Sequence, residues 1–382
     1  MKKLLLFLIL SFFSAQSYAA SCPDGNEPIK TISADGTYYE YKCGLSVLEA
    51  PKAEFYQRQY DMNSEVDQIL SQRKTINPFL AWNYTKLGEG NYYGISWSGH
   101  ERKPLSKIFL LEFNEVYWNY NYVGKIWSQW KNSIKQNTFT SNIDWDHDAE
   151  YGVTKAMNII DPEYTSAFAE EVHVGFADGF HGVMLDWWHT NHPTPWRGTI
   201  LEKVMITMTN EIRKKSGNEF LIIGNTNWRK NSNLVSSLNG VFSELYKTPY
   251  SRSDSFSFAE IAEMEELIKF NEKHLRYPKL IAFEPWRITD KSDLTNRTSE
   301  DNLRFARLYS AMATVIPEHG YILYADNNPD YEIGDHDHHY YDVYSVDLGK
   351  PVSKYTPIAK GVAYKKFEDG YIAFNRLEYD VT

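Results

Sequence analysis

Short apolar runs alternate with longer amphipathic segments along the chain from Ile76 onward. The runs are rich in Ile, Val, Leu and Phe, which favours buried strands, and their lengths are those of strands rather than helices. This alternation is typical of repeated βα units built around a parallel sheet. We predict strands at Phe79 to Asn83, Ile108 to Asn114, Gly182 to Trp187, Phe220 to Asn225, Gly240 to Leu245, Leu280 to Trp286 and Tyr321 to Ala325.

Apolar residues recur at helical spacing in the segments between these runs. The predicted helices are Pro162 to Asp178, Thr199 to Lys215, Phe258 to His274 and Glu300 to His319. Seven strands leave one missing from an eight-stranded barrel, and the best remaining candidate is the weaker pattern at Thr138 to Trp145, which we place third. The predicted fold is of the α/β class, a (β/α)8 TIM barrel.

The end of the chain has a different pattern. Gly361 to Asn375 reads as two strands joined by a turn at Glu368-Asp369-Gly370, which predicts a small C-terminal β-hairpin extension. No repeat of about 20 to 50 residues is visible, which argues against solenoids and propellers. The expected organisation is a signal peptide at 1–20, an N-terminal segment at 21–75, the catalytic barrel at 76–339 and the β extension at 340–382.

The first residues have the layout of a secretory signal peptide. Lys2 and Lys3 precede an apolar run from Leu4 to Phe13, and small residues follow at Ser17 and Ala19. The run is too short to span a bilayer, and no later uninterrupted apolar stretch reaches about 18 residues. We therefore expect a periplasmic or extracellular protein with no membrane anchor.

Only two cysteines are present, Cys22 and Cys43, and both lie near the expected mature N-terminus. In an oxidising compartment the simplest interpretation is one disulfide, worth about 3 kcal/mol on the loop-entropy model. The alternative is a lipid-modified Cys22, but Ala19-Ala20-Ser21 lacks the large aliphatic residue expected three positions before such a cysteine.

The charge and the aromatic content narrow the class of partner. There are 40 basic and 50 acidic residues, a net charge of −10, and loss of Lys2 and Lys3 with the leader makes this about −12. Such a balance argues against binding nucleic acid through bulk charge. Aromatic residues make up 15% of the chain, with 11 Trp and 28 Tyr, whose flat faces suit stacking on sugar rings. A Tyr-rich surface without a ligand is the alternative.

Four predicted strands end in a carboxylate: Asp186, Glu244, Glu284 and Asp326. Catalytic groups of such barrels stand at the C-terminal ends of strands, and acidic residues are otherwise depleted in strands. Hydrolysis of a glycosidic bond needs two carboxyl groups, one protonated and one ionised. The alternative is that each carboxylate caps a strand or pairs with a basic residue.

Two of these strand ends carry a family resemblance. Asp178 to Trp188, with Gly-Val-Met-Leu-Asp ending at Asp186, and Gly-Val-Phe-Ser-Glu ending at Glu244 resemble glycoside hydrolases related to the α-galactosidase and endo-α-1,4-polygalactosaminidase barrels. The resemblance implies a retaining mechanism with Asp186 as nucleophile and Glu244 as general acid/base. The Asn-Glu pair of the large β-glycosidase clan is missing at the fourth strand, so Glu244 is preferred to Glu284 as the acid.

Polar and aromatic residues at the predicted strand ends, or in the loops that follow, are the candidates for substrate binding. Ordinary packing at the barrel rim is the alternative for each Trp among them. The candidates are Trp82, Asn83, Trp187, Trp188, His189, Asn225, Trp228, Glu284, Trp286 and Asp326.

The segment Asp335 to His339 (Asp-His-Asp-His-His) follows the last predicted strand. Such a density of His and Asp could hold a divalent metal, but a solvated His-rich loop is the alternative, and we assign neither a metal nor a cofactor. The predicted function is hydrolysis of O-glycosidic bonds in a polysaccharide or oligosaccharide. The alternatives are an inactive glycan-binding barrel and a metal-dependent polysaccharide deacetylase that uses this loop.

Overall fold

The computed structural model describes residues 29–32, 39–42, 66–80, 92–97, 106–113, 117–119, 139–143, 154–157, 159–177, 181–190, 198–245, 256–287, 298–325 and 339–377. The expected leader, Cys22 and Cys43 lie outside these residues, so the leader and the disulfide stay predictions.

The chain divides into two compact units, 1–60 and 61–382. In the first, β1 (Ile29–Ile32) pairs antiparallel with β2 (Tyr39–Lys42). Among the described residues, no helix combines the length and the apolar character needed to cross a bilayer.

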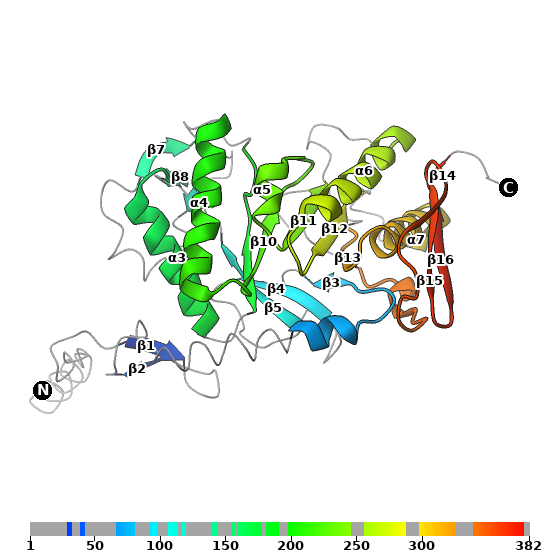
Figure 1. The fold of residues 1–382 in the computed structure, drawn as a ribbon, viewed down its shortest axis with the longest axis horizontal. Helices are drawn as coiled ribbons and strands as arrows, with labels where there is room; N and C mark the ends of the chain where they lie inside the picture. Colours follow the sequence, from blue (N-terminus) through cyan, green and yellow to red (C-terminus); the bar gives the residue numbers. More distant parts are fainter. Residues whose placement is uncertain are drawn as a thin grey trace, which may run out of the picture. The chain divides into compact units, whose positions relative to one another are not determined.

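Eight strands form the central sheet of the second unit (Figure 1), in the order β13-β12-β11-β10-β9-β5-β4-β3. Each neighbouring pair is parallel. The strands are β3 (Phe79–Leu80), β4 (Tyr92–Trp97), β5 (Ser106–Phe113), β9 (Gly182–Leu185), β10 (Leu221–Asn225), β11 (Gly240–Leu245), β12 (Leu280–Pro285) and β13 (Gly320–Ile322).

The two ends of this sheet are joined to each other. Pro78, just before β3, forms a parallel bridge with Ile322 of β13, and the Ile322 N–H donates to the Asn77 carbonyl at 3.0 Å. Eight parallel strands with their first and last members in contact are the arrangement of a (β/α)8 barrel. The predicted fold class is therefore confirmed.

The assignment of the eighth strand was wrong. The segment expected at Thr138 to Trp145 contains β7 (Phe139–Ile143), which pairs antiparallel with β8 (Thr154–Met157) in a separate sheet that also holds β6 (Tyr117–Asn119). The missing barrel strand is β4, whose sequence Tyr-Tyr-Gly-Ile-Ser-Trp is broken by Gly and Ser and gives a weak strand signal. Since β4 and β5 are the second and third strands, Asp186 and Glu244 keep their places on the fourth and sixth.

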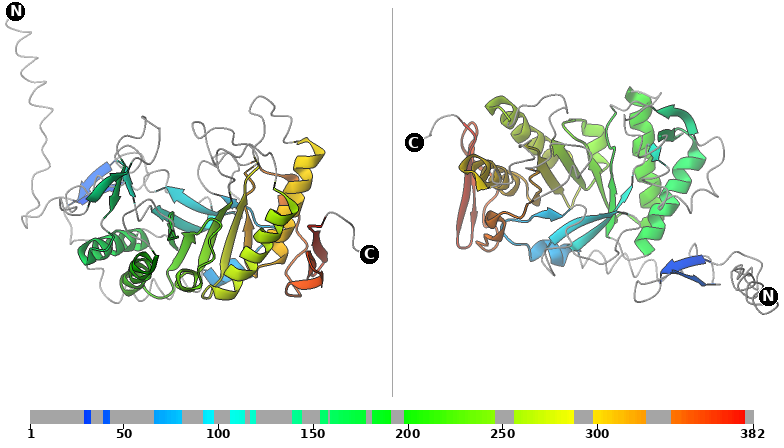
Figure 2. Two further views of the ribbon diagram at one scale, coloured as in Figure 1. Left: turned by 90° about the horizontal axis from the view of Figure 1, so that it is seen from above. Right: turned by 180° about the vertical axis from the view of Figure 1, so that it is seen from behind.

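The described helices lie outside the sheet (Figures 1 and 2). Those labelled in Figure 1 are α3 (Pro162–Ala177), α4 (Gly198–Ser216), α5 (Ser232–Ser236), α6 (Phe258–His274) and α7 (Glu300–Val315), and residues 66–71 are helical as well. Helix α6 matches its predicted bounds, and its start is fixed by a capping box: Ser257 Oγ accepts the Glu260 N–H at 3.3 Å, and the Glu260 carboxylate accepts the Ser257 N–H at 2.6 Å. Helix α7 ends before the predicted His319: its C-cap Ile316 is still in helical conformation, but Pro317 has no N–H with which to continue the helical hydrogen bonds.

Aromatic contacts show which strand positions face the barrel interior. The ring of Phe79 on β3 lies 5.8 Å from that of Phe242 on β11 and 6.0 Å from that of Tyr321 on β13. Because β3 and β11 are not neighbours in the sheet, the first contact crosses the interior. Phe283 on β12 instead lies 6.0 Å from Tyr309 of α7, so its position faces the helices.

The C-terminal extension is a small antiparallel sheet. The predicted hairpin is present as β15 (Val362–Phe367) and β16 (Gly370–Asn375), joined where Phe367 pairs with Gly370. A third strand, β14 (Thr356–Ala359), pairs with β15 and was not predicted. A short 3-10 helix, η5 (Asp342–Ser345), precedes this sheet in the chain.

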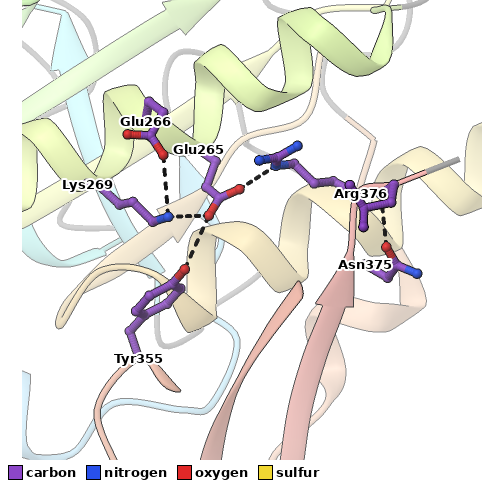
Figure 3. A network of polar contacts seen from close by, with 7 residues as sticks. Glu265, Glu266, Lys269, Tyr355, Asn375 and Arg376 are labelled. Carbon is purple, nitrogen blue, oxygen red and sulfur yellow. Dashed lines mark hydrogen bonds and ion pairs between the residues drawn. The ribbon is translucent and has the colours of Figure 1, made fainter. Parts of the chain in front are cut away.

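A buried polar network holds the extension against the barrel helices (Figure 3). Glu265 of α6 is 1% exposed and pairs with Arg376, which follows β16, and with Lys269 one turn further along α6. The Tyr355 hydroxyl donates to the same carboxylate at 3.2 Å. From β15, the buried Lys365 donates to the carbonyls of Thr314 at 2.7 Å and Pro317 at 2.5 Å. These contacts satisfy charges that would otherwise be costly to bury.

Candidate active site

Four consecutive barrel strands, β9 to β12, bring polar side chains to one place. Asn225 at the end of β10 is the register partner of Phe242, which faces the interior, so Asn225 faces it too. Glu244 lies two residues beyond Phe242 on β11 and therefore points to the same side, and Glu284 is its register partner on β12. Asp186 directly follows Leu185, the partner of Gly224, and so lies beside Asn225. All four stand at the C-terminal ends of their strands.

One side-chain nitrogen contacts both predicted catalytic carboxylates. Asn225 Nδ2 donates to Glu244 Oε2 at 2.8 Å and to Asp186 Oδ1 at the longer distance of 3.4 Å. Both distances are measured from the same nitrogen. The two carboxylate oxygens therefore cannot be further apart than the sum of the two distances, about 6.2 Å. Asp186 and Glu244 are both partly exposed, whereas Asn225 is buried.

The orientation of the Asn225 amide follows from its other contact. The backbone N–H of Asn227 donates to Asn225 Oδ1 at 3.2 Å, and an N–H group can only donate. The oxygen of the amide therefore faces the backbone, and its NH2 group faces the carboxylates. Asn227 itself has φ of 48°, the left-handed region that Asn tolerates better than most residues.

His189 continues this polar arrangement. Its Nε2 lies 3.2 Å from Asn227 Nδ2, and its ring lies 5.4 Å from that of Trp187. Burial, reinforced by the positive charge of Arg229, lowers the pKa of His189 to about 4. The imidazole is therefore neutral at neutral pH, where it can accept or donate a hydrogen bond without adding charge.

Glu284 occupies a different environment from the other two carboxylates. Its side chain is 0% exposed, and its Cα is the register partner of that of Glu244. The backbones of neighbouring strands are about 4.8 Å apart, so the two acidic side chains leave the sheet next to each other. The Asn225 contacts nevertheless connect Glu244, and not Glu284, to Asp186.

Trp188, predicted to bind substrate, lies in the core. It is 0% exposed, and its indole N–H is directed at the Leu234 carbonyl of α5 at 3.5 Å. It packs so closely on Gly224 that a Cβ at that position would lie 2.6 Å from Trp188 Cβ. The side chain therefore has no surface for stacking on a sugar, and its position is explained by packing between β10 and α5.

The other residues predicted to bind substrate differ in their exposure, and some lie outside the described residues. Trp187 and Trp228 are partly exposed, and Trp228 packs against Phe256 with ring centroids 5.8 Å apart. Trp286 is 9% exposed. Three candidates fall outside the described residues: Trp82, Asn83 and Asp326.

The metal alternative depends mostly on residues outside the described part of the chain. Of the segment Asp335 to His339, only His339 is described, and its ring contacts Tyr341 edge-on at 4.9 Å. Within the described residues, no group of three or more His, Cys, Asp or Glu is arranged to hold a metal ion.

The predicted site residues did not include Asn227, nor was the contact between Asn225 and the carboxylates predicted. The signal was present as Asn-Thr-Asn directly after the apolar run of β10, a composition typical of a turn. What the sequence does not give is the direction of the Asn225 side chain, which depends on the register between β10 and β11.

Two carboxylates at this separation can act on the same bond of a bound molecule. No protein-family model matches the sequence, and no curated protein sequence matches it either. Among solved structures, the chain is similar to the glycoside hydrolase domain of PelA from Pseudomonas aeruginosa, with a TM-score of 0.45 and 10% identity over 67% of this chain and 96% of that one. It is also similar to Aspergillus fumigatus Ega3 in complex with galactosamine, with a TM-score of 0.42 and 10% identity over 67% and 93% of the two chains.

A third similar structure is the cyclic α-maltosyl-(1→6)-maltose hydrolase from Arthrobacter globiformis. Its TM-score is 0.37, with 11% identity over 68% of this chain and 64% of that one. All three TM-scores are below 0.5, so we base neither the fold nor the function on these similarities. The fold rests on the parallel sheet and its joined ends, and the function on the arrangement of the strand-end side chains.

Proposed function

We propose that this protein is a glycoside hydrolase that cleaves O-glycosidic bonds in a polysaccharide or oligosaccharide. The observation that carries the proposal is the pair of carboxylates, Asp186 and Glu244, that contact one amide nitrogen at the C-terminal ends of the barrel strands. Catalytic groups of (β/α)8 enzymes occupy this position, and glycoside hydrolysis needs two carboxyl groups close together.

In the proposed mechanism the two carboxyl groups have different tasks. Asp186, ionised, attacks the anomeric carbon and forms a covalent glycosyl ester. Glu244, protonated, gives its proton to the departing glycosidic oxygen and then takes a proton from the water that hydrolyses the ester. The two oxygens that face Asn225 are no more than about 6.2 Å apart, which is compatible with the roughly 5 to 5.5 Å between the carboxyl groups of retaining enzymes, and the choice of retention follows the family resemblance.

Other side chains are assigned to substrate binding in this proposal. Trp187 and Trp228 retain exposed surface for stacking on a sugar ring, and the neutral His189 lies directly beside Trp187. Glu284 lies next to the acid Glu244 on the neighbouring strand, but it is 0% exposed and therefore has no surface for contacting a sugar. Hydrogen bonds from partly exposed polar groups to sugar hydroxyls supply orientation.

The proposal is tested by incubating the purified protein with a panel of polysaccharides and measuring released reducing ends. We expect release from at least one polymer, and no release by the double variant Asp186→Asn/Glu244→Gln, which controls for contaminating enzymes. Binding to a glycan without release by the parent protein would identify an inactive glycan-binding barrel. Release of acetate that a chelator abolishes would instead identify a deacetylase.

A further inference from the structure

The Asn225 side chain is buried and has partners at both ends of its amide. It is 2% exposed, its oxygen accepts the Asn227 N–H at 3.2 Å, and its nitrogen reaches Glu244 at 2.8 Å and Asp186 at 3.4 Å. An amide NH2 group has two hydrogens, one for each carboxylate. An Asn used in this way is poorly placed to bind substrate, which is the role that the sequence predicted for it.

We infer that Asn225 is a positioning residue that fixes the separation of Asp186 and Glu244 and stabilises the charge that Asp186 carries when it attacks and that Glu244 acquires as it gives up its proton. This inference rests on the proposed function, because it assigns Asn225 a task in that reaction. The amide engages one oxygen of each carboxylate, which orients the other oxygen of Asp186 toward the anomeric carbon and that of Glu244 toward the leaving group. A carboxylate that accepts hydrogen bonds is stabilised in its charged form.

The backbone around Asn225 is built to hold its amide still. The Asn227 N–H that fixes the amide orientation comes from a residue in left-handed conformation, and the Asn225 carbonyl accepts the Trp188 N–H at 2.9 Å. Asn225 is thus connected to the end of β9, next to Asp186, by a main-chain contact as well as by its side chain. Such support is what holds catalytic groups in productive geometry.

Glu202, a carboxylate outside the site, shows how amide donors change the pKa of a carboxyl group. On the surface, Glu202 accepts hydrogen bonds from Asn231 Nδ2 and Asn233 Nδ2, both at 2.7 Å. These two bonds lower the pKa of Glu202. The described titratable groups around Asn225 are Asp186 and His189 from the end of β9, Glu244 of β11 and Glu284 of β12.

The test compares Asn225→Ala, which removes both donors, with Asn225→Ser, which keeps one hydroxyl donor. Asn233→Ala is the matched control, since it removes an amide that donates to a carboxylate outside the site. The first measurement is a ¹³C NMR titration of the Asp186 and Glu244 carboxyl groups, which needs no substrate. We expect both pKa values to rise in Asn225→Ala, to rise less in Asn225→Ser and to stay unchanged in the control.

The second measurement is the pH dependence of kcat and KM on a polysaccharide that the parent protein hydrolyses. We expect kcat of Asn225→Ala to fall by about 10²-fold with KM within about threefold, because misplacing catalytic groups by about 1 Å costs this much. Both limbs of the pH profile should move to higher pH. A residue that only supports the fold would lower the melting temperature without moving either limb.

The two possible failures are distinguishable. If the parent protein releases sugar but Asn225→Ala and Asn225→Ser keep its kcat and its carboxyl pKa values, the positioning role is wrong and the proposed function stands. If the parent protein hydrolyses nothing, the proposed function fails, while unchanged carboxyl pKa values would overturn the inference independently. If Asn225→Ala does not fold, the same titration of Asn225→Ser tests the inference: unchanged carboxyl pKa values would overturn it.

Discussion

Asp186→Asn is expected to lower kcat by about 10⁴-fold or more and to leave the fold intact. The substitution keeps the size of the side chain but replaces the nucleophile with an amide that cannot attack the anomeric carbon. It also places a second amide beside Asn225 Nδ2, which now contacts the Asp186 carboxylate at 3.4 Å. Losses of this size accompany removal of a nucleophile in other hydrolases. The measurement is kcat on the polysaccharide found in the panel.

Asp301→Asn is the matched control for this prediction. Asp301 is on the surface of α7, with a side chain that is 72% exposed and an ion pair to Arg304 at 3.5 Å. Parental kcat is expected for this variant. Near-parental kcat in Asp186→Asn, together with a large loss in Glu284→Gln, would contradict the assignment and move the catalytic role to β12.

Glu265→Ala is expected to lower the free energy of unfolding by about 3 to 5 kcal/mol. The carboxylate is 1% exposed, and its removal leaves the guanidinium of Arg376, whose side chain is 7% exposed, as a buried charge without its partner. Removing one member of a buried pair costs this much because the remaining charge is desolvated. The measurement is chemical denaturation of the parent protein and of Glu265→Ala at the same pH.

Glu266→Ala provides the comparison, because it removes the neighbouring residue on α6. Glu266 is 61% exposed and lies 3.5 Å from Lys269, the same lysine that pairs with Glu265. Exposed ion pairs contribute about 0 to 1 kcal/mol, so this variant should be close to the parent in stability. Equal destabilisation by the two substitutions would show that the network in Figure 3 does not anchor the C-terminal sheet.

The parts of the fold with a strong local pattern were predictable. Helix α6 has a capping box at Ser257 and apolar residues at helical spacing, and its bounds match those predicted. Strand β11, an apolar run with a single acidic residue near its end, matches as well. Strand β4 was missed because Gly94 and Ser96 interrupt its apolar pattern, so its pairing with β3 and β5 is what identifies it as a barrel strand. Helix α5, with five residues, is too short to show a period.

The candidate site was predictable only in part, because part of it depends on contacts in the folded chain that a local pattern does not show. The rule that barrel enzymes place catalytic groups at strand ends uses sequence position alone and selects Asp186, Glu244, Glu284 and Asp326, while the family resemblance chose Asp186 and Glu244 among them. Side-chain direction decides the rest. Trp188 follows Asp186 and Trp187 in the chain, yet it packs on Gly224 under α5, and a string of aromatic residues does not reveal which of them turns inward.

The most direct test of the central claim is to trap the glycosyl ester. A fluorinated glycosyl fluoride of the sugar found in the panel forms the ester quickly, because fluoride is a good leaving group, and the ring fluorine slows its hydrolysis. Mass spectrometry of the digested protein is predicted to show one sugar attached to the peptide that contains Asp186. A sugar on the peptide of Glu244 or Glu284, or inverted product without any adduct, would contradict the account.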